Sequence, residues 1–253
     1  MSWSAQQYSA FENERTRPVR DLVAAIPEFR VRQAVDLGCG PGNSTEVLAA
    51  SYPQAVISGI DSSGDMVEAA RRRLPGLTFD CQDIASWQPE REFDVILANA
   101  SLQWLPDHEV LYPRLLTHLT PGGSLAIQTP DNLQEPAHQL LREIAASGPW
   151  AARLGQAGHP PRHDAAWYYA LLSPLARRLD VWRTTYLHPL AGVRAVVEWF
   201  KGTALLPYLN RLDEAEQGEF LARYEQALGQ AYPALADGTV LLPFPRLFIV
   251  ATR

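Results

Sequence analysis

Short apolar runs alternate with longer amphipathic stretches through the first half of the chain. Gly, Pro, Asp or Asn residues bound most of these runs, a pattern typical of buried strands joined by helices. We therefore expect an α/β fold with a mostly parallel sheet and helices on both faces. The expected strands are 34–37, 55–60, 77–81, 93–98 and 124–129, and the expected helices are 44–52, 64–74 and 107–119.

The segment "TPGG" at 120–123 predicts a turn into the fifth strand. Beyond about residue 130 the alternation weakens, and a Gly- and Pro-rich stretch at 148–164 predicts a loop or lid. The other elements expected there are a helix at 136–146, a strand at 180–186, helices at 193–206 and 214–232, and a final strand at 244–253.

We expect a single domain over 1–253. Within it, residues 1–30 would form an N-terminal helical lid, and about 190–235 a helical insertion near the C-terminus.

The composition and charge of the chain exclude some classes of function. The 253 residues are 47% hydrophobic and 20% charged, which suits a globular protein with a sizeable core. A net charge of −6 argues against nucleic acid as a partner. The sequence has neither a secretory leader nor an apolar run of about 18 residues, so we expect a cytoplasmic protein that does not bind membranes.

The sequence "DLGCGPG" at 36–42 concentrates glycine between an expected strand and an expected helix. Glycines at such a turn allow backbone to approach a ligand closely. The spacing is GxGxG, whereas dinucleotide-binding proteins carry GxGxxG, so a pyridine-nucleotide oxidoreductase is disfavoured. Asp36, Asp61 and Asp83 lie at or after the ends of three successive strands. Three acids without a lysine suit a ligand with ribose, adenine and positive charge, and do not suit a pyrophosphate.

These residues resemble the motifs of the class I S-adenosylmethionine-dependent methyltransferases. The resemblance implies a Rossmann-like sheet whose last strand is antiparallel, with S-adenosylmethionine as cofactor. It places the glycine loop behind the methionine part, Asp61 on the ribose, and Asp83 and Ile84 beside the adenine. The cofactor-binding residues expected in this way are Asp36, Gly38, Cys39, Gly40, Asp61, Ser62, Met66, Asp83, Ile84 and Asn99.

The same fold bears on the two cysteines, Cys39 and Cys81. They follow strands that have another strand between them, a separation of about 9–10 Å, which is too long for a disulfide. We expect both to be buried free thiols.

The segment "NASLQWLPDH" at 99–108 follows the fourth strand, where this fold faces the transferred methyl group. It lacks the NPPY-like motif of amino methyltransferases and the Pro-Cys pair of the cytosine enzymes. The stretch 127–136 offers only Asp131 and Glu135, too few acids for a metal-dependent catechol enzyme, so we expect no metal. With these classes excluded, we expect the methyl acceptor to be a small molecule.

The sequence is also similar to one family within this class, the trans-aconitate 2-methyltransferases. The similarity rests on "GIDSSGDM" (59–66), "NASLQWLPDH", "DVWRTTYLH" (180–188) and "FPRLFIVA" (244–251). It implies a methyl ester formed on one carboxylate of trans-aconitate or a similar small polycarboxylate. The alternatives are another small-molecule acceptor, or a non-catalytic regulatory protein that binds the cofactor.

A carboxylate is already ionised at neutral pH, so we expect no general base and no catalytic side chain. The other carboxylates need cationic or hydroxyl partners, and Arg offers bidentate contacts. The expected substrate-binding residues are Tyr8, Arg15, Trp104, Tyr168, Tyr169 and Arg246.

Overall fold

The computed structural model describes residues 12–27, 30–154, 157–158 and 162–253. Seven strands form one sheet in the order β3-β2-β1-β4-β5-β7-β6. The strands are β1 (Gln33–Leu37), β2 (Val56–Asp61), β3 (Thr78–Cys81), β4 (Phe93–Asn99), β5 (Leu119–Pro130), β6 (Arg178–Leu190) and β7 (Val240–Thr252). The chain divides into two compact units, which we describe separately.

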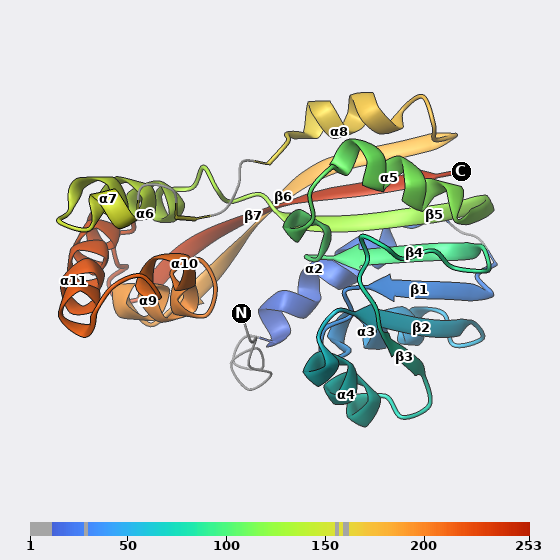
Figure 1. Ribbon diagram of the computed structural model, residues 1–253, viewed down its shortest axis with the longest axis horizontal. Coiled ribbons are helices and arrows are strands. Elements are labelled where there is room, and N and C mark those ends of the chain that lie inside the picture. The colour runs from blue at the N-terminus through green and yellow to red at the C-terminus, as the bar shows by residue number, and fades with distance from the viewer. Residues whose placement is uncertain (1–11, 28–29, 155–156, 159–161) are drawn as a thin grey trace. The chain divides into compact units, whose positions relative to one another are not determined.

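Unit 1 comprises Met1–Pro130, His163–Thr184 and Leu247–Arg253. Its strands β1 to β5 are parallel, with β1 between β2 and β4 (Figure 1). The register pairs Asp36 with Gly59 on β2 and with Leu97 on β4. The carboxyl ends of three strands therefore meet at one edge, which is where ligands bind in open α/β sheets.

The last strand runs antiparallel to β5, as the resemblance implied. The Gly122 amide near the start of β5 donates to the carbonyl of Arg253, beyond the end of β7, and the Arg253 amide donates to Gly123. The α/β fold class with an antiparallel last strand is confirmed.

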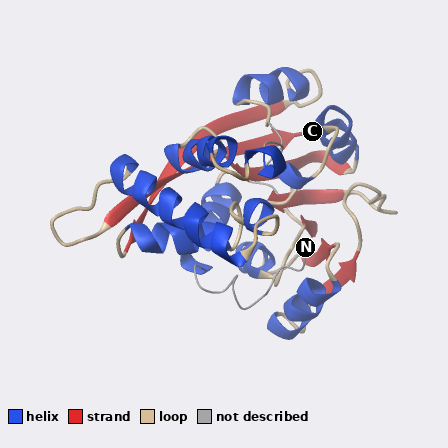
Figure 2. Cartoon of the chain, turned by 60° about the vertical axis from the view of Figure 1, so that its left-hand side comes forward, coloured by secondary structure: helices blue, strands red, loops and turns tan. Residues whose placement is uncertain are grey.

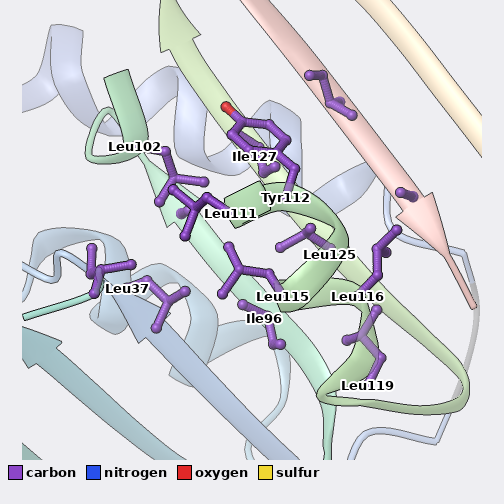
Figure 3. Close-up of a cluster of buried hydrophobic side chains, with 14 of the residues drawn as sticks. Leu37, Ile96, Leu102, Leu111, Tyr112, Leu115, Leu116, Leu119, Leu125 and Ile127 are labelled. Carbon is purple, nitrogen blue, oxygen red and sulfur yellow. The ribbon is translucent and has the colours of Figure 1, made fainter. Parts of the chain in front are cut away.

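Helices cover both faces of the sheet in unit 1. Their bounds are α2 (Glu12–Ala24), α3 (Asn43–Ser51), α4 (Gly64–Arg73), the 3-10 turn η2 (Leu102–Trp104), α5 (His108–Thr117) and α8 (Ala165–Leu172). Figure 3 shows α5 in front of β4 and β5, with paler helices behind the strands. The main core lies beneath α5, because Leu111, Leu115 and Leu116 recur at helical spacing and face Ile96 and Leu125.

The prediction of a turn at 120–123 is wrong. Those residues belong to β5, which begins at Leu119. A side chain at Gly123 would lie 2.9 Å from the carbonyl oxygen of Phe93, so glycine lets the two strands approach each other. The register between β4 and β5 is irregular at Phe93 and Val95. Gly123 therefore serves a close contact between β4 and β5 inside the sheet.

Unit 2 comprises Asp131–Arg162 and Thr185–Arg246, and it is mainly helical (Figure 2). Its helices are α6 (Pro136–Ser147), α7 (Ala151–Leu154), α9 (Val193–Lys201), α10 (Leu206–Leu209) and α11 (Glu214–Ala231). The predicted helix at 193–206 is in fact two helices, because α9 ends at Lys201 and Gly202 follows it. Among the described residues, no helix has the length and apolar character needed to cross a membrane.

Candidate functional site

The glycine loop joins the end of β1 to the start of α3. The amides of Gly38 and Cys39 both donate to the carbonyl of Ile60 on β2, at 2.8 and 2.9 Å. Gly38 has a φ of +74°, in the left-handed region that favours glycine. A side chain there would also overlap Ser101, which follows β4. Gly38 is therefore required by the packing of the protein itself.

Gly40 differs from its two neighbouring glycines. A Cβ on Gly42 would lie 3.4 Å from Ala70, whereas a Cβ on Gly40 would meet no described atom within 4 Å. Of these three glycines, Gly40 is the one whose Cα faces open space. Backbone that faces open space can approach a ligand.

Asp36 is a buried carboxylate that is only partly satisfied. The hydroxyls of Ser44 and Thr45 donate to its Oδ2 at 2.6 and 2.7 Å. Its Oδ1 is buried and has no hydrogen-bond partner within the described part of the chain. Burial raises the pKa of Asp36 to about 6, although the hydrogen bonds from the two hydroxyls lower it. The free Oδ1 calls for a donor, and a cationic one suits it best.

Asp61 connects the end of β2 to the glycine loop. Its Oδ2 accepts from the amide of Gly40, and its Oδ1 accepts from the amide of Ser63, each at 2.9 Å. Ser63 in turn is the N-cap of α4. Each carboxylate oxygen keeps one lone pair after these bonds. Asp61 is half-buried, so it can still receive hydroxyl groups from a ligand.

The remaining cofactor-side residues surround these strand ends. Ile84 is buried and its Cδ1 would lie 3.6 Å from a Cβ on Gly38, and Met66 is also buried. Asn99 ends β4, and its Oδ1 is buried without a partner among the described residues. Ser62 and Asp83 are exposed. The Asp83 carboxylate accepts from the amide of Ala85 at 2.9 Å, which fixes its orientation.

Both cysteines are free, as predicted. Cys39 is buried, and burial raises the pKa of its thiol. The prediction that Cys81 is buried is wrong, because its side chain is exposed at the end of β3, an edge strand. Its sulfur lies 3.6 Å from the carbonyl oxygen of Ser62.

The predicted substrate-side residues have very different environments. Tyr8 lies outside the described residues, as does the side chain of Arg15 in α2. Trp104 is 48% exposed and Tyr169 is 53% exposed. Tyr168, by contrast, is buried, and its hydroxyl lies 2.7 Å from Nδ1 of His108.

Arg246 belongs to unit 2 and is 5% exposed. Its guanidinium carbon lies 4.9 Å from the centre of the Phe244 ring, a cation–π contact. The buried His188 is 5.6 Å from the same ring and stacks on Trp199 at 4.8 Å. At this depth the guanidinium is not part of the exposed surface.

Sequence reasoning missed Ser44, Thr45 and His108. Ser44 and Thr45 occupy the first turn of α3, which brings their hydroxyls back toward the strand that precedes the loop. The pair of hydroxyl residues that follows the glycine loop could have indicated these partners of Asp36. His108 left no such signal, because its partners lie 6 and 60 residues away.

Comparison with known proteins assigns this arrangement to a class. Residues 34–123 match the family model described as a methyltransferase domain. The structure of the YcgJ protein from Bacillus subtilis superposes with a TM-score of 0.62 at 13% identity, covering 94% of this chain and 98% of that one. The fold is that of a class I methyltransferase.

Full-length relatives narrow the class to a family. The trans-aconitate 2-methyltransferase of Methylobacterium nodulans is 55% identical over 99% of this chain and 98% of its own length. The trans-aconitate 2-methyltransferase of Rhizobium etli is 50% identical over the whole of both chains. The chain belongs to the trans-aconitate 2-methyltransferase family.

We expect Asp36 to make the protein more stable as the pH falls from 7 to 4. The pKa of Asp36 is about 6 in the folded chain and 3.8 ordinarily, so the folded chain binds more protons between these values. The free energy of unfolding then rises as pH falls through this window, by up to about 3 kcal/mol. Urea unfolding of the wild type and of Asp36→Asn at several pH values measures this rise. The contributions of the other carboxylates cancel when the free energies of unfolding of the two proteins are subtracted. A difference that does not change with pH would contradict the raised pKa.

Proposed function

We propose that this protein transfers a methyl group from S-adenosylmethionine to one carboxylate of trans-aconitate, and so forms a monomethyl ester. The observation that carries the proposal is the full-length similarity to trans-aconitate 2-methyltransferases at 50–55% identity. The strand-end site of unit 1 supports it independently, because its unpaired groups suit this cofactor.

The residues at the strand ends fit S-adenosylmethionine. The Oδ1 atoms of Asp36 and Asn99 are buried and have no hydrogen-bond partner among the described residues. They can therefore accept hydrogen bonds from an ammonium group. Gly40 presents backbone to open space, beside the methionine part. Asp61 keeps lone pairs for ribose hydroxyls. Ser62, Met66, Asp83 and Ile84 are the neighbours proposed for the adenine, with Gly38 and Cys39 forming the rest of the loop.

The reaction does not require the protein to remove a proton from the acceptor. When bound, S-adenosylmethionine supplies an electrophilic methyl group on a sulfonium ion. The acceptor carboxylate is the nucleophile and is ionised without help from a base. Charge is lost as anion and cation combine, so excluding water favours the transition state. Alignment of the acceptor contributes up to about 7–11 kcal/mol, and the protein supplies it by positioning.

The acceptor's other carboxylates need anchors. We assign this role to Arg15 and Arg246, with Tyr8, Trp104 and Tyr169 as further contacts. Arg246 is the best supported, because its guanidinium is held in a buried, aromatic setting and can bind a carboxylate in bidentate form. The Tyr168 hydroxyl is already engaged with His108, so we leave it out of this set.

Methyl-labelled S-adenosylmethionine tests the proposal directly. The protein is incubated with it and with trans-aconitate, citrate, isocitrate or a panel of phenols. Label that appears on trans-aconitate and is released by base is the expected result, since esters hydrolyse readily. Base-stable label on another acceptor would replace trans-aconitate with that acceptor. Cofactor binding without transfer to any acceptor would support the non-catalytic alternative.

Replacing Asp61 by Ala should weaken cofactor binding about 10- to 100-fold. The change removes the acceptor proposed for the ribose hydroxyls and leaves the amides of Gly40 and Ser63 unpaired. Isothermal titration with S-adenosylhomocysteine measures it. Asp80→Ala is the matched control, because Asp80 is an exposed carboxylate on the neighbouring β3. Equal affinity for both variants would remove Asp61 from the cofactor site.

Replacing Arg246 by Ala should raise the KM for trans-aconitate about 10- to 100-fold while cofactor affinity stays normal. The reason is that a charge-assisted, bidentate contact to a carboxylate is lost. Steady-state kinetics with varied trans-aconitate measures the effect. Arg223→Ala, which removes a half-exposed Arg of α11 in the same unit, serves as the control. An unchanged KM in a folded Arg246→Ala protein would rule out the anchor.

A further inference from the structure

The segment between β4 and α5, residues 100–107, is held in a strained backbone conformation. Ala100 has a φ of +53° and Asp107 a φ of +56°. Among the described residues, these are the non-glycine residues with positive φ. Such residues are costly and persist where the surrounding structure enforces them. We call residues 100–107 the acceptor loop, because they follow the strand end that carries Asn99.

Backbone and side-chain hydrogen bonds hold the acceptor loop, and the amide of Ala100 donates to the carbonyl of Gln128 on β5 at 2.8 Å. The side chains of Ser101, Gln103 and His108 add further bonds. The Ser101 hydroxyl donates to the carbonyl of Leu37 at 2.6 Å, which ties the loop to the end of β1. The Gln103 side-chain amide donates to the carbonyl of Ala100 at 2.7 Å, within the strained turn. A further bond runs from Nε2 of His108 to the carbonyl of Leu102, at 2.9 Å.

The bond to Leu102 determines the protonation of His108. A carbonyl can only accept, so Nε2 carries the hydrogen. Burial lowers the pKa of His108, which keeps the ring neutral and leaves Nδ1 as an acceptor. The Tyr168 hydroxyl, 2.7 Å away, therefore donates to Nδ1. Tyr168 lies on α8, so this chain of bonds connects α8 to the acceptor loop.

We propose that His108 and Tyr168 are a positioning pair, which holds the acceptor loop in the geometry that aligns the methyl acceptor. This rests on the proposed methyl transfer. Both side chains are buried, at 8% and 3% exposure, so they act through the loop. The Cβ of Ser101 is packed against Gly38, so a shift of the loop changes the distance between the acceptor and the glycine loop.

The position of the pair predicts which kinetic constant responds. A loop that is held less firmly can still bind substrate, but it samples the aligned geometry less often. Small misplacements of this kind lower the rate of the chemical step strongly. The pair should therefore affect kcat, whereas loss of an anchor would affect KM.

Three variants test the pair. Tyr168→Phe removes one hydroxyl and keeps the ring, which stacks on Tyr112 at 5.0 Å. His108→Gln keeps an amide N–H for the Leu102 carbonyl, but its acceptor Oε1 does not take the position of the imidazole Nδ1 that receives the Tyr168 hydroxyl. The double variant shows whether both residues act through one bond. Tyr52→Phe is the matched control, because it removes a half-buried hydroxyl from unit 1 at the end of α3.

The first measurement does not depend on activity. Hydrogen exchange of peptides that cover 100–107 should be about five- to tenfold faster in Tyr168→Phe than in Tyr52→Phe, because one hydrogen bond of the loop's support is lost. Unchanged exchange in a folded variant would overturn the positioning pair, whether or not the wild type methylates trans-aconitate.

The second measurement is kinetic. Tyr168→Phe should lower kcat about tenfold, with the KM for trans-aconitate and the Kd for the cofactor within about twofold of the wild type. The double variant should be no slower than His108→Gln alone. A loss of thermal stability with normal kcat, or two losses that multiply, would overturn the pair. An inactive wild type would refute the proposed function and leave the exchange result to decide the pair.

Discussion

The contact between the ends of β1 and β4 is the constraint on which the site depends. Gly38 and Ser101 lie so close that a Cβ on Gly38 would overlap Ser101, and the Ser101 hydroxyl bonds to the carbonyl of Leu37. This contact fixes the glycine loop relative to the acceptor loop. It also explains why position 38 is a glycine, whereas Gly42 packs against Ala70 of α4. Gly40 is the one left to face a ligand.

Asp36, which we propose as a cofactor-binding group, is buried at the expense of the stability of the fold. Two hydroxyls from α3 satisfy one carboxylate oxygen, and the other is buried without a partner in the described chain. A half-satisfied buried carboxylate is unfavourable, and its raised pKa reflects that. A cation bound beside it would restore the ordinary charged state. Burial of Asp36 therefore lowers the stability of the fold without ligand, and a bound cation would offset that loss.

The sequence predicted the parallel strands and the residues at their ends well, because both follow from local patterns. Strand alternation and the glycine spacing are readable within a few residues, and Asp36, Asp61 and Asn99 lie at the expected strand ends. The failures involved distant contacts. Gly123 packs against the carbonyl of Phe93, and Cys81 is exposed because β3 is an edge strand. The contact between Tyr168 and His108 likewise joins residues that are far apart in the sequence. No local pattern reports such partners.

Ala100 has a consequence for how narrowly the protein selects its acceptor. A glycine would adopt the φ of +53° with less strain, but it would also let the segment visit many other conformations. The methyl side chain of Ala100 restricts that freedom, so the segment is stiff and does not reshape itself around a larger molecule. Such stiffness favours accurate alignment of one acceptor over a wide range of acceptors.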